Sequence, residues 1–371
     1  MDIKEFTDLL GADFYTGVPD SQLRALCDHL QTTYGKDPRH HLIAANEGGA
    51  AALAAGYHLA TGRVPVVYMQ NSGEGNIINP AASLLHPLVY GIPVIFIVGW
   101  RGQPGIHDEP QHIYQGQVTK KLLEDMDIAS CVVSPETTAQ EIRQQMTVFR
   151  DLLAQGKSVA FVIRKGALQN DSPALYRNRY AMTREEIIRQ VVSHTGEDPI
   201  VSTTGKASRE LFEIREENHQ DHSRDFLTVG SMGHSSSIAL GLAIHSGKRV
   251  WCIDGDGAAL MHLGSMAITG SVYPQSFIHI LINNEAHETV GGMPTAGNKV
   301  DFCQIAMGCG YASAVRVDSP ETLDRAIRSA LQQKGPCLIE AACAIGARAD
   351  LGRPTTTPQE NKQAFMAHLQ K

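Results

Sequence analysis

Short runs of β-branched residues alternate with longer stretches of helical periodicity along most of this chain of 371 residues. Such alternation is the sequence form of β-α-β units, in which crossover helices join parallel strands. It predicts an α/β protein with two similar domains, each a mostly parallel sheet flanked by helices. The expected strands are 12–15, 41–44, 64–69, 93–98, 131–133 and 159–163 in the first half, and 199–202, 226–229, 250–253, 277–282, 312–317 and 337–341 in the second.

A polar stretch without apolar periodicity separates the two halves. It contains Asn170, Pro173 and Asn178, which are typical of turns and loops. We therefore expect a first domain over 1–168, a linker over 169–183 and a second domain over 184–371. A chain with 43% hydrophobic residues has enough apolar material for two cores.

The charge pattern argues against several classes of partner. The net charge of -7 comes from interspersed acids and bases, without a basic run that would bind nucleic acid. The N-terminus does not resemble a signal peptide, and no apolar run reaches the roughly 20 residues that span a bilayer. We expect a cytoplasmic protein without a membrane partner. The seven cysteines form no CxxC pair, which favours reduced, structural thiols over zinc ligands.

The most specific motif is Gly255-Asp256-Gly257 at the end of one expected strand, followed by Asn283-Asn284 at the end of the next, with Asn284 28 positions after Asp256. Carboxylate, amide and backbone carbonyl oxygens are the ligands that magnesium prefers. The glycines would let backbone amides approach a diphosphate, and a helix expected near Ala258 would direct its N-terminus at that charge. Alone, Gly-Asp-Gly also fits a simple turn, but the asparagine pair favours a metal site.

This combination resembles the cofactor-binding motif of thiamine-diphosphate-dependent enzymes, in which GDG is followed by NN at a similar distance. The resemblance implies that Asp256, Asn284 and the carbonyl of Ala286 hold magnesium. It also implies that Glu47, in Asn46-Glu47-Gly48-Gly49, is the carboxylate beside the pyrimidine ring of the cofactor. Without the downstream motif, Glu47 would simply be a favourable residue of a first helical turn.

The same resemblance assigns further cofactor contacts. Met232 occupies the place of the apolar residue that separates the two cofactor rings, although a methionine can also fill a core gap. Gly230 would offer its carbonyl to the pyrimidine amine. The expected diphosphate-binding residues are Thr204, Gly205, Gly233, His234, Gly255, Gly257 and Ala258.

Over its whole length the chain resembles the phosphonopyruvate decarboxylases, a short two-domain group that also includes the sulfopyruvate decarboxylases. The segments that carry the resemblance are 15–21, 68–73, 99–102, 105–112, 203–211 and 283–292. It implies decarboxylation of 3-phosphonopyruvate, a small anionic 2-oxoacid, to phosphonoacetaldehyde and carbon dioxide in phosphonate biosynthesis. It also implies thiamine diphosphate and magnesium as cofactors, and a homo-oligomer with active sites at subunit interfaces.

A substrate with a carboxylate and a phosphonate requires cations or amide donors. Arg101, in a loop with tryptophan and glycine, is the first candidate, with Asn71, Ser72 and Lys206 as further ones. Lys206 and the nearby Arg209 fit a solvated surface equally well. For proton transfer near neutral pH, histidines are suitable groups. The catalytic candidates are Glu47, Asp20, His107, His112 and His287.

Two positions depart from the family pattern, Glu285 where glycine is frequent and Met293 where glutamine is common. Sulfopyruvate stays open as the alternative substrate. A catalytically inactive, cofactor-binding regulatory module has no need of Glu47, which disfavours it. A nicotinamide-dinucleotide enzyme would require a GxGxxG unit after a first strand, and the sequence contains none there.

Overall fold

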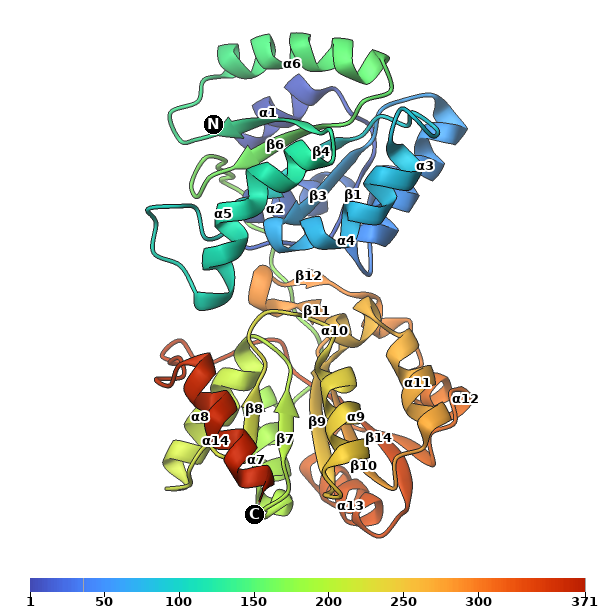
Figure 1. Ribbon diagram of the computed structural model, residues 1–371, viewed down its shortest axis with the longest axis vertical. Helices are drawn as coiled ribbons and strands as arrows, with labels where there is room; N and C mark the ends of the chain where they lie inside the picture. The colour runs from blue at the N-terminus through green and yellow to red at the C-terminus, as the bar shows by residue number, and fades with distance from the viewer. Residues whose placement is uncertain (36, 371) are drawn as a thin grey trace. The chain divides into compact units, whose positions relative to one another are not determined.

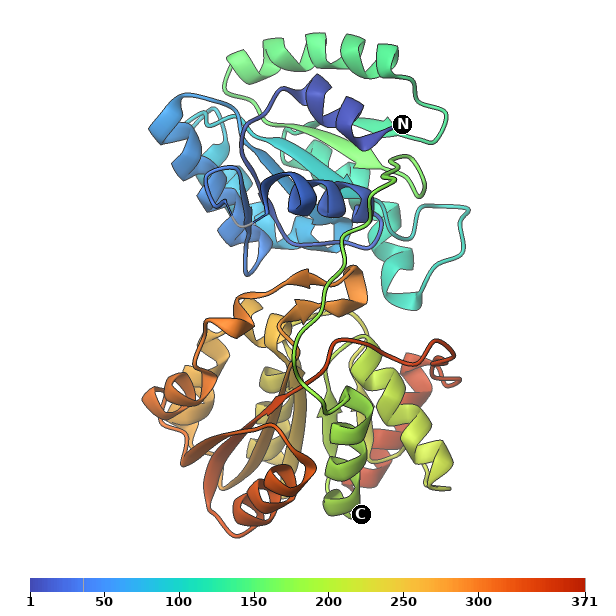
Figure 2. The same ribbon diagram turned by 180° about the vertical axis from the view of Figure 1, so that it is seen from behind.

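The structure is a computed structural model that describes residues 1–35 and 37–370. The chain divides into two compact units, Met1–Leu175 and Tyr176–Lys371. Each unit contains a six-stranded sheet in which all paired strands are parallel, with helices on both faces (Figures 1 and 2). The expected α/β class is confirmed.

The first unit has the strand order β2-β1-β3-β4-β6-β5. The inner strands β3, β4 and β6 are apolar and buried along nearly their whole length, as parallel strands covered on both faces must be. Its strands are β1 (Tyr15–Gly17), β2 (His41–Ile43), β3 (Val66–Gln70), β4 (Ile95–Gly99), β5 (Ala129–Val133) and β6 (Val159–Ile163), and its α-helices are α1 (Ile3–Leu10), α2 (Arg24–Tyr34), α3 (Glu47–Thr61), α4 (Glu74–Asn79), α5 (Pro110–Asp125) and α6 (Ala139–Ala154).

The second unit has the order β13-β14-β10-β9-β7-β8 and an additional two-stranded antiparallel sheet, β11-β12. The strands are β7 (Ile200–Ser202), β8 (Asp225–Leu227), β9 (Val250–Gly255), β10 (Ser276–Asn283), β11 (Ala286–His287), β12 (Met293–Pro294), β13 (Ser313–Val317) and β14 (Gly335–Ala342). The helices are α7 (Arg184–Thr195), α8 (Lys206–Glu217), α9 (Ser235–His245), α10 (Asp256–Met261), α11 (Gly264–Val272), α12 (Phe302–Gly308), α13 (Pro320–Leu331) and α14 (Pro358–Leu369).

Each expected strand has a counterpart, with boundaries that shift by a few residues. The strand expected over 250–253 continues to Gly255, because β10 pairs with it as far as Ile282 opposite Gly255. The small β11-β12 sheet was not expected. Its strands are two residues long, too short for an alternating pattern to show in the sequence.

The order of the strands determines where each unit can bind a ligand. The chain reverses direction across the first sheet between β1 and β3, and across the second between β7 and β9. Open parallel sheets bind ligands beyond the carboxyl ends of the strands at such points. The segments that follow these strands contain Asp20 and residues 71–73 in the first unit, and residues 203–205 and Asp256 in the second.

Among the residues that the structure describes, no helix combines the length and the apolar character that crossing a membrane requires.

Candidate active site

The parallel pairing of β9 and β10 brings Asp256 and Asn284 together in the second unit. Gly255 lies opposite Ile282, so the two strands end side by side and the two predicted ligands follow at once. Burial raises the pKa of Asp256 to about 7, against hydrogen bonds from the Thr295 hydroxyl and from the backbone amides of Gly257 and Asn284. Asp256 is 2% exposed. A buried carboxyl with a raised pKa gains stability from a nearby cation.

The surroundings of Asp256 fit a hard divalent cation. Ala286, the third predicted ligand, belongs to the same turn as Asn284, and its amide donates to Asn284 Oδ1 at 3.1 Å. Gly297 borders the carboxylate, and a Cβ there would lie 2.7 Å from Asp256 Oδ2. The glycine therefore leaves room for this oxygen and for the Thr295 hydroxyl that donates to it. Carboxylate, amide and carbonyl oxygens together form the donor set that suits magnesium.

Two of the predicted diphosphate-binding glycines lie where the side chain of a larger residue would collide with neighbouring atoms. Gly205, before α8, has φ +95°, and a Cβ there would lie 2.9 Å from the Thr289 hydroxyl. Gly233, before α9, has φ +88°, and a Cβ there would lie 2.9 Å from the carbonyl of Ala258. The loop after β8 thus approaches the first turn of α10 through backbone alone, as phosphate binding by amides requires.

The remaining predicted contacts lie in the same loops. The hydroxyl of Thr204 accepts the amide of Gly230 at 3.1 Å, which joins the loops after β7 and β8. Met232 is half-buried and His234 is exposed. A half-buried methionine in a loop is not a core residue, so the packing explanation loses support while its role against the cofactor stays a prediction.

Lys206 and Arg209, two of the cations considered from the sequence, are occupied by partners within the second unit. The Lys206 ammonium donates to Glu288 Oε1 at 2.6 Å. The Arg209 guanidinium donates to the carbonyl of Gly352 at 2.5 Å and to that of Leu351. Neither is a simple solvated charge, and neither is unpaired.

Glu47 of the first unit is the first residue of α3. The side chain of Asn46 caps this helix by accepting the amide of Gly49 at 2.8 Å. Glu47 is 4% exposed, and its Oε2 accepts Asn76 Nδ2 at 2.6 Å. Burial raises the pKa of Glu47, against this hydrogen bond. Gly73 packs on the side chain, since a Cβ there would lie 2.5 Å from Glu47 Cγ.

Asp20 follows β1 and is fully buried. Its carboxyl group accepts Gln70 Nε2 at 2.6 Å and the amide of Gln22 at 3.2 Å. Burial raises the pKa of Asp20, against the Gln70 hydrogen bond and the charge of Arg101. Gly99 is required at the end of β4, because a Cβ there would collide with Asp20 Oδ2. The ends of three adjacent strands therefore hold this acid.

The three predicted substrate-binding residues of the first unit differ in availability. Arg101 donates to Asp108 Oδ2 at 2.8 Å and to the Ser21 hydroxyl at 3.1 Å. Asn71 is fully buried and supports that loop by donating to the Arg101 carbonyl at 2.8 Å. Ser72 is exposed, and its hydroxyl donates to a side-chain oxygen of Gln70. Asn71 thus positions Arg101, whereas Ser72 lies at the surface of the unit.

The histidine candidates fall into two groups. His107 is exposed. His112 and His287 are buried, and burial lowers the pKa of each to about 4, with Arg101 contributing at His112. Both rings are therefore neutral at pH 7, which differs from the near-neutral titration on which their selection rested. The His287 ring packs on Gly257 of the cofactor motif.

Several residues that shape these sites were not identified from the sequence. Glu74, directly after Gly73, is fully buried, and burial raises its pKa to about 9, only partly opposed by Gln115. Asn76, Thr295, Gly297 and Glu288 contact the predicted site residues directly. Their proximity to the motifs in the chain, within residues 73–76 and 283–297, was the available signal.

A second polar cluster lies beneath the cofactor motif. The ligand-type atoms of Cys252, Asp254 and His279 lie within 4.8 Å of one another, and all three residues are buried. His279 contacts the Tyr311 hydroxyl at 3.2 Å and Asp254 at 3.4 Å, and Asp254 accepts the amide of Gly255 at 2.9 Å. These groups satisfy one another, and they support the end of β9.

Comparison with known proteins adds independent information. Residues 5–139 match the family model of the thiamine pyrophosphate enzyme N-terminal TPP binding domain, and residues 203–341 match that of the C-terminal TPP binding domain. The phosphonopyruvate decarboxylase of Streptomyces viridochromogenes is 35% identical over 97% of this chain and 92% of its own length. That of Streptomyces hygroscopicus is 34% identical over 96% and 90%. The sulfopyruvate decarboxylase of Methanosarcina acetivorans is 27% identical over 76% of each chain.

Proposed function

The chain belongs to the thiamine pyrophosphate enzymes, and from this membership we propose that it decarboxylates 3-phosphonopyruvate to phosphonoacetaldehyde and carbon dioxide. It is a thiamine-diphosphate-dependent carboxy-lyase. The choice of substrate is supported by two phosphonopyruvate decarboxylases that align with nearly the whole chain at 34% and 35% identity. A role in phosphonate biosynthesis stays a prediction from the sequence.

One observation supports an active enzyme above all others: the chain combines ligand-type side chains at Asp256 and Asn284 with a buried carboxyl group at Glu47. A regulatory module that only binds the cofactor would gain nothing from burying Glu47, because burial of a carboxyl costs stability unless a function requires it. We therefore set aside the inactive module.

Thiamine diphosphate, when bound, supplies the electron-accepting ring that makes loss of carbon dioxide from a 2-oxoacid feasible. Asp256, Asn284 and Ala286 would hold the magnesium that accompanies the diphosphate, and residues 204–205 and 230–234 would contact the diphosphate end. Glu47 would share a proton with the pyrimidine ring, and burial shifts its pKa in the direction that favours the protonated form. His112 and His287 would act as neutral hydrogen-bonding groups.

We also propose that the active form is a homo-oligomer whose sites use the first unit of one subunit and the second unit of another. Large apolar residues lie exposed on helices of both units, such as Leu59 of α3 at 73% and Ile268 of α11 at 58%, and such residues favour association. Subunits with Glu47→Ala and subunits with Asp256→Ala, mixed after dissociation and reassembly, should regain part of the activity. A fully active monomer would contradict this arrangement.

The substrate is tested by supplying phosphonopyruvate, sulfopyruvate and pyruvate in parallel and measuring carbon dioxide release. We expect phosphonopyruvate to give the highest kcat/KM. Preference for sulfopyruvate would support the second candidate, which the relative in Methanosarcina acetivorans makes reasonable. Release from none of the three by enzyme loaded with thiamine diphosphate and magnesium would contradict the proposed function.

A further inference from the structure

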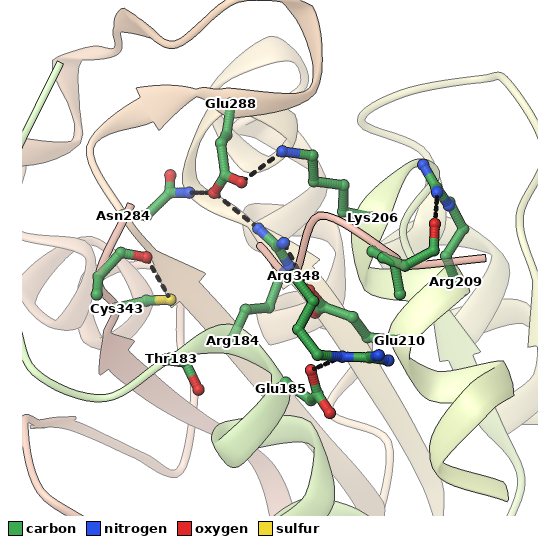
Figure 3. A network of polar contacts seen from close by, with 12 residues as sticks. Thr183, Arg184, Glu185, Lys206, Arg209, Glu210, Asn284, Glu288, Cys343 and Arg348 are labelled. Carbon is green, nitrogen blue, oxygen red and sulfur yellow. Dashed lines mark hydrogen bonds and ion pairs between the residues drawn. The ribbon is translucent and has the colours of Figure 1, made fainter. Parts of the chain in front are cut away.

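A largely buried group of charged and amide side chains in the second unit surrounds Glu288 (Figure 3). We call it the Glu288 cluster, and it consists of Arg184, Lys206, Glu210, Asn284 and Glu288. We propose that Glu288 is a positioning residue that determines which end of the Asn284 side-chain amide is available to the metal. This inference rests on the proposed function, since it concerns the same metal site.

The two ends of the Asn284 amide have different partners. Its Nδ2 donates to Glu288 Oε2 at 2.9 Å, while its Oδ1 accepts the backbone amide of Ala286 at 3.1 Å. Rotation of the amide by 180° would direct Oδ1 at a carboxylate and the NH2 group at a backbone N–H. Both contacts would then be repulsive. Only the observed orientation of the amide places Oδ1 of Asn284 on the side of the turn that contains Ala286.

The orientation of the amide depends on the Glu288 carboxylate, whose oxygens accept hydrogen bonds from every partner around it. Two of these partners are cations that hold the carboxylate in place. Arg184 donates to Glu288 Oε2 at 2.9 Å and Lys206 to Oε1 at 2.6 Å. Figure 3 shows the carboxylate between these two cations and the Asn284 amide.

The other members hold Arg184 in place. Its guanidinium makes two hydrogen bonds of 2.7 Å to the Glu210 carboxylate, and both residues are buried. Two cations and two carboxylates give the Glu288 cluster no net charge, so it does not draw the metal away from Asp256. The contact also gives Lys206 a structural role that differs from the predicted substrate contact.

The backbone of Asn284 is fixed separately. Asn178 Nδ2 donates to the carbonyl of Asn284 at 3.0 Å and to that of Cys343 at 2.8 Å. Although the backbone is held, the side-chain amide of Asn284 can still rotate, and the contact with Glu288 fixes its orientation. Residues that orient metal ligands in this way commonly change metal affinity 10- to 100-fold when they are altered, as an order of magnitude.

The test compares Glu288→Gln in two backgrounds by calorimetric titration of magnesium in the presence of thiamine diphosphate. In the otherwise unchanged chain, the introduced amide can donate as well as accept, so we expect magnesium binding to weaken about 10-fold or more. In an Asn284→Asp background both side-chain oxygens are equivalent acceptors, so the same change should no longer weaken binding. The matched control is Glu213→Gln. Glu213 lies on α8 and pairs with Arg348, outside the Glu288 cluster, so this change should leave the affinity for magnesium unchanged.

An effect of Glu288→Gln in both backgrounds by the same factor, or in neither, would overturn the inference. Thermal unfolding of the cofactor-free variants distinguishes a purely structural role of Glu288 from its role in orienting Asn284. A purely structural role would lower the unfolding midpoint in both backgrounds, and magnesium affinity would then not differ between them. If the unaltered chain binds neither magnesium nor thiamine diphosphate, the proposed function itself fails, and the inference fails with it. That outcome is recognised before any variant is compared.

Discussion

The buried acids of the two units differ in the partners that surround them. In the first unit, Glu47 and Asp20 accept hydrogen bonds from the neutral amides of Asn76 and Gln70, and burial raises the pKa of both acids. In the second unit, Glu288 lies against two cations, and its pKa is lowered. Neutral partners leave an acid with a high affinity for protons, whereas cationic partners fix its charge.

This difference matches the division of labour that we propose. The first unit would handle a proton, and the second would hold a metal and a diphosphate in a rigid frame. Asp256, an acid of the second unit whose pKa is raised to about 7, fits the comparison because its cationic partner would be the metal itself. Changes to each type of acid should therefore have different consequences.

The largest effect should come from Asp256→Ala. Removal of a metal ligand is expected to weaken magnesium-dependent binding of thiamine diphosphate by on the order of 100-fold or more. The fold should persist, since the carboxyl group is costly to bury without a cation. Calorimetric titration and circular dichroism measure the two properties. Asp350→Ala, at an exposed site, is the control, and an unchanged affinity in Asp256→Ala would refute the metal assignment.

Glu47→Gln should separate proton handling from binding. The amide keeps the shape of the side chain, so cofactor affinity should change little, while turnover should fall on the order of 100-fold or more because the group can no longer exchange a proton. Exchange of the reactive cofactor proton, followed by quenched-flow NMR, should slow with turnover. If Glu47 merely favours the N-terminus of α3, the variant would lose about 1 kcal/mol of stability and retain normal turnover.

The sequence predicted the parts of this comparison that depend on local patterns. β-branched runs predicted the strands, and the spacing of Asp256 and Asn284 predicted two ligands at adjacent strand ends. The partners of the buried acids were not predictable in this way, since Glu288 lies 82 positions from Lys206 and 104 from Arg184. The sequence therefore placed Lys206 against the substrate, while the structure pairs it with Glu288.

Burial was the second property that sequence patterns did not provide. His112 and His287 were selected because histidine usually titrates near neutral pH, but burial lowers the pKa of both to about 4. Glu74 was not singled out at all, although it is one of the most strongly perturbed acids of the first unit. Whether a polar residue beside a glycine at a strand end is buried depends on the helices that pack over it.

Glu74 allows the comparison to be tested by stability. Its pKa rises from about 4.5 in the unfolded chain to about 9 in the folded protein, so folding favours the protonated form. The contribution of Glu74 to the free energy of unfolding is therefore fully present below pH 4.5, and it is lost as the pH rises toward 9. Glu74→Gln removes this loss and should stabilise the protein by about 2 kcal/mol at pH 8, with little change at pH 4.5.

The measurement for Glu74→Gln is the urea-unfolding midpoint at both pH values. Glu210→Gln is the counterpart in the second unit and should act with the opposite sign. It leaves the buried Arg184 with one carboxylate fewer, which should destabilise the protein by about 3 kcal/mol at pH 8. Equal signs for the two variants at pH 8 would remove the distinction between the units.

The smallest expected effect concerns Glu285, which lies between the predicted ligands Asn284 and Ala286. Its φ of +62° belongs to the left-handed region, which glycine, the residue expected here from the family resemblance, adopts without steric cost. The conformation persists in this chain with support from a 2.6 Å hydrogen bond, which the Tyr180 hydroxyl donates to Glu285 Oε1.

Two substitutions separate this hydrogen bond from the backbone conformation. Glu285→Ala removes the hydrogen bond but keeps the unfavourable positive φ, whereas Glu285→Gly removes the hydrogen bond and the conformational cost together. The glycine variant should therefore be more stable than the alanine variant by about 1 kcal/mol, as measured by urea unfolding. Both variants should bind magnesium like the unaltered chain, because the Glu285 side chain bonds Tyr180. Equal stability of the two variants would show that this turn carries no backbone strain.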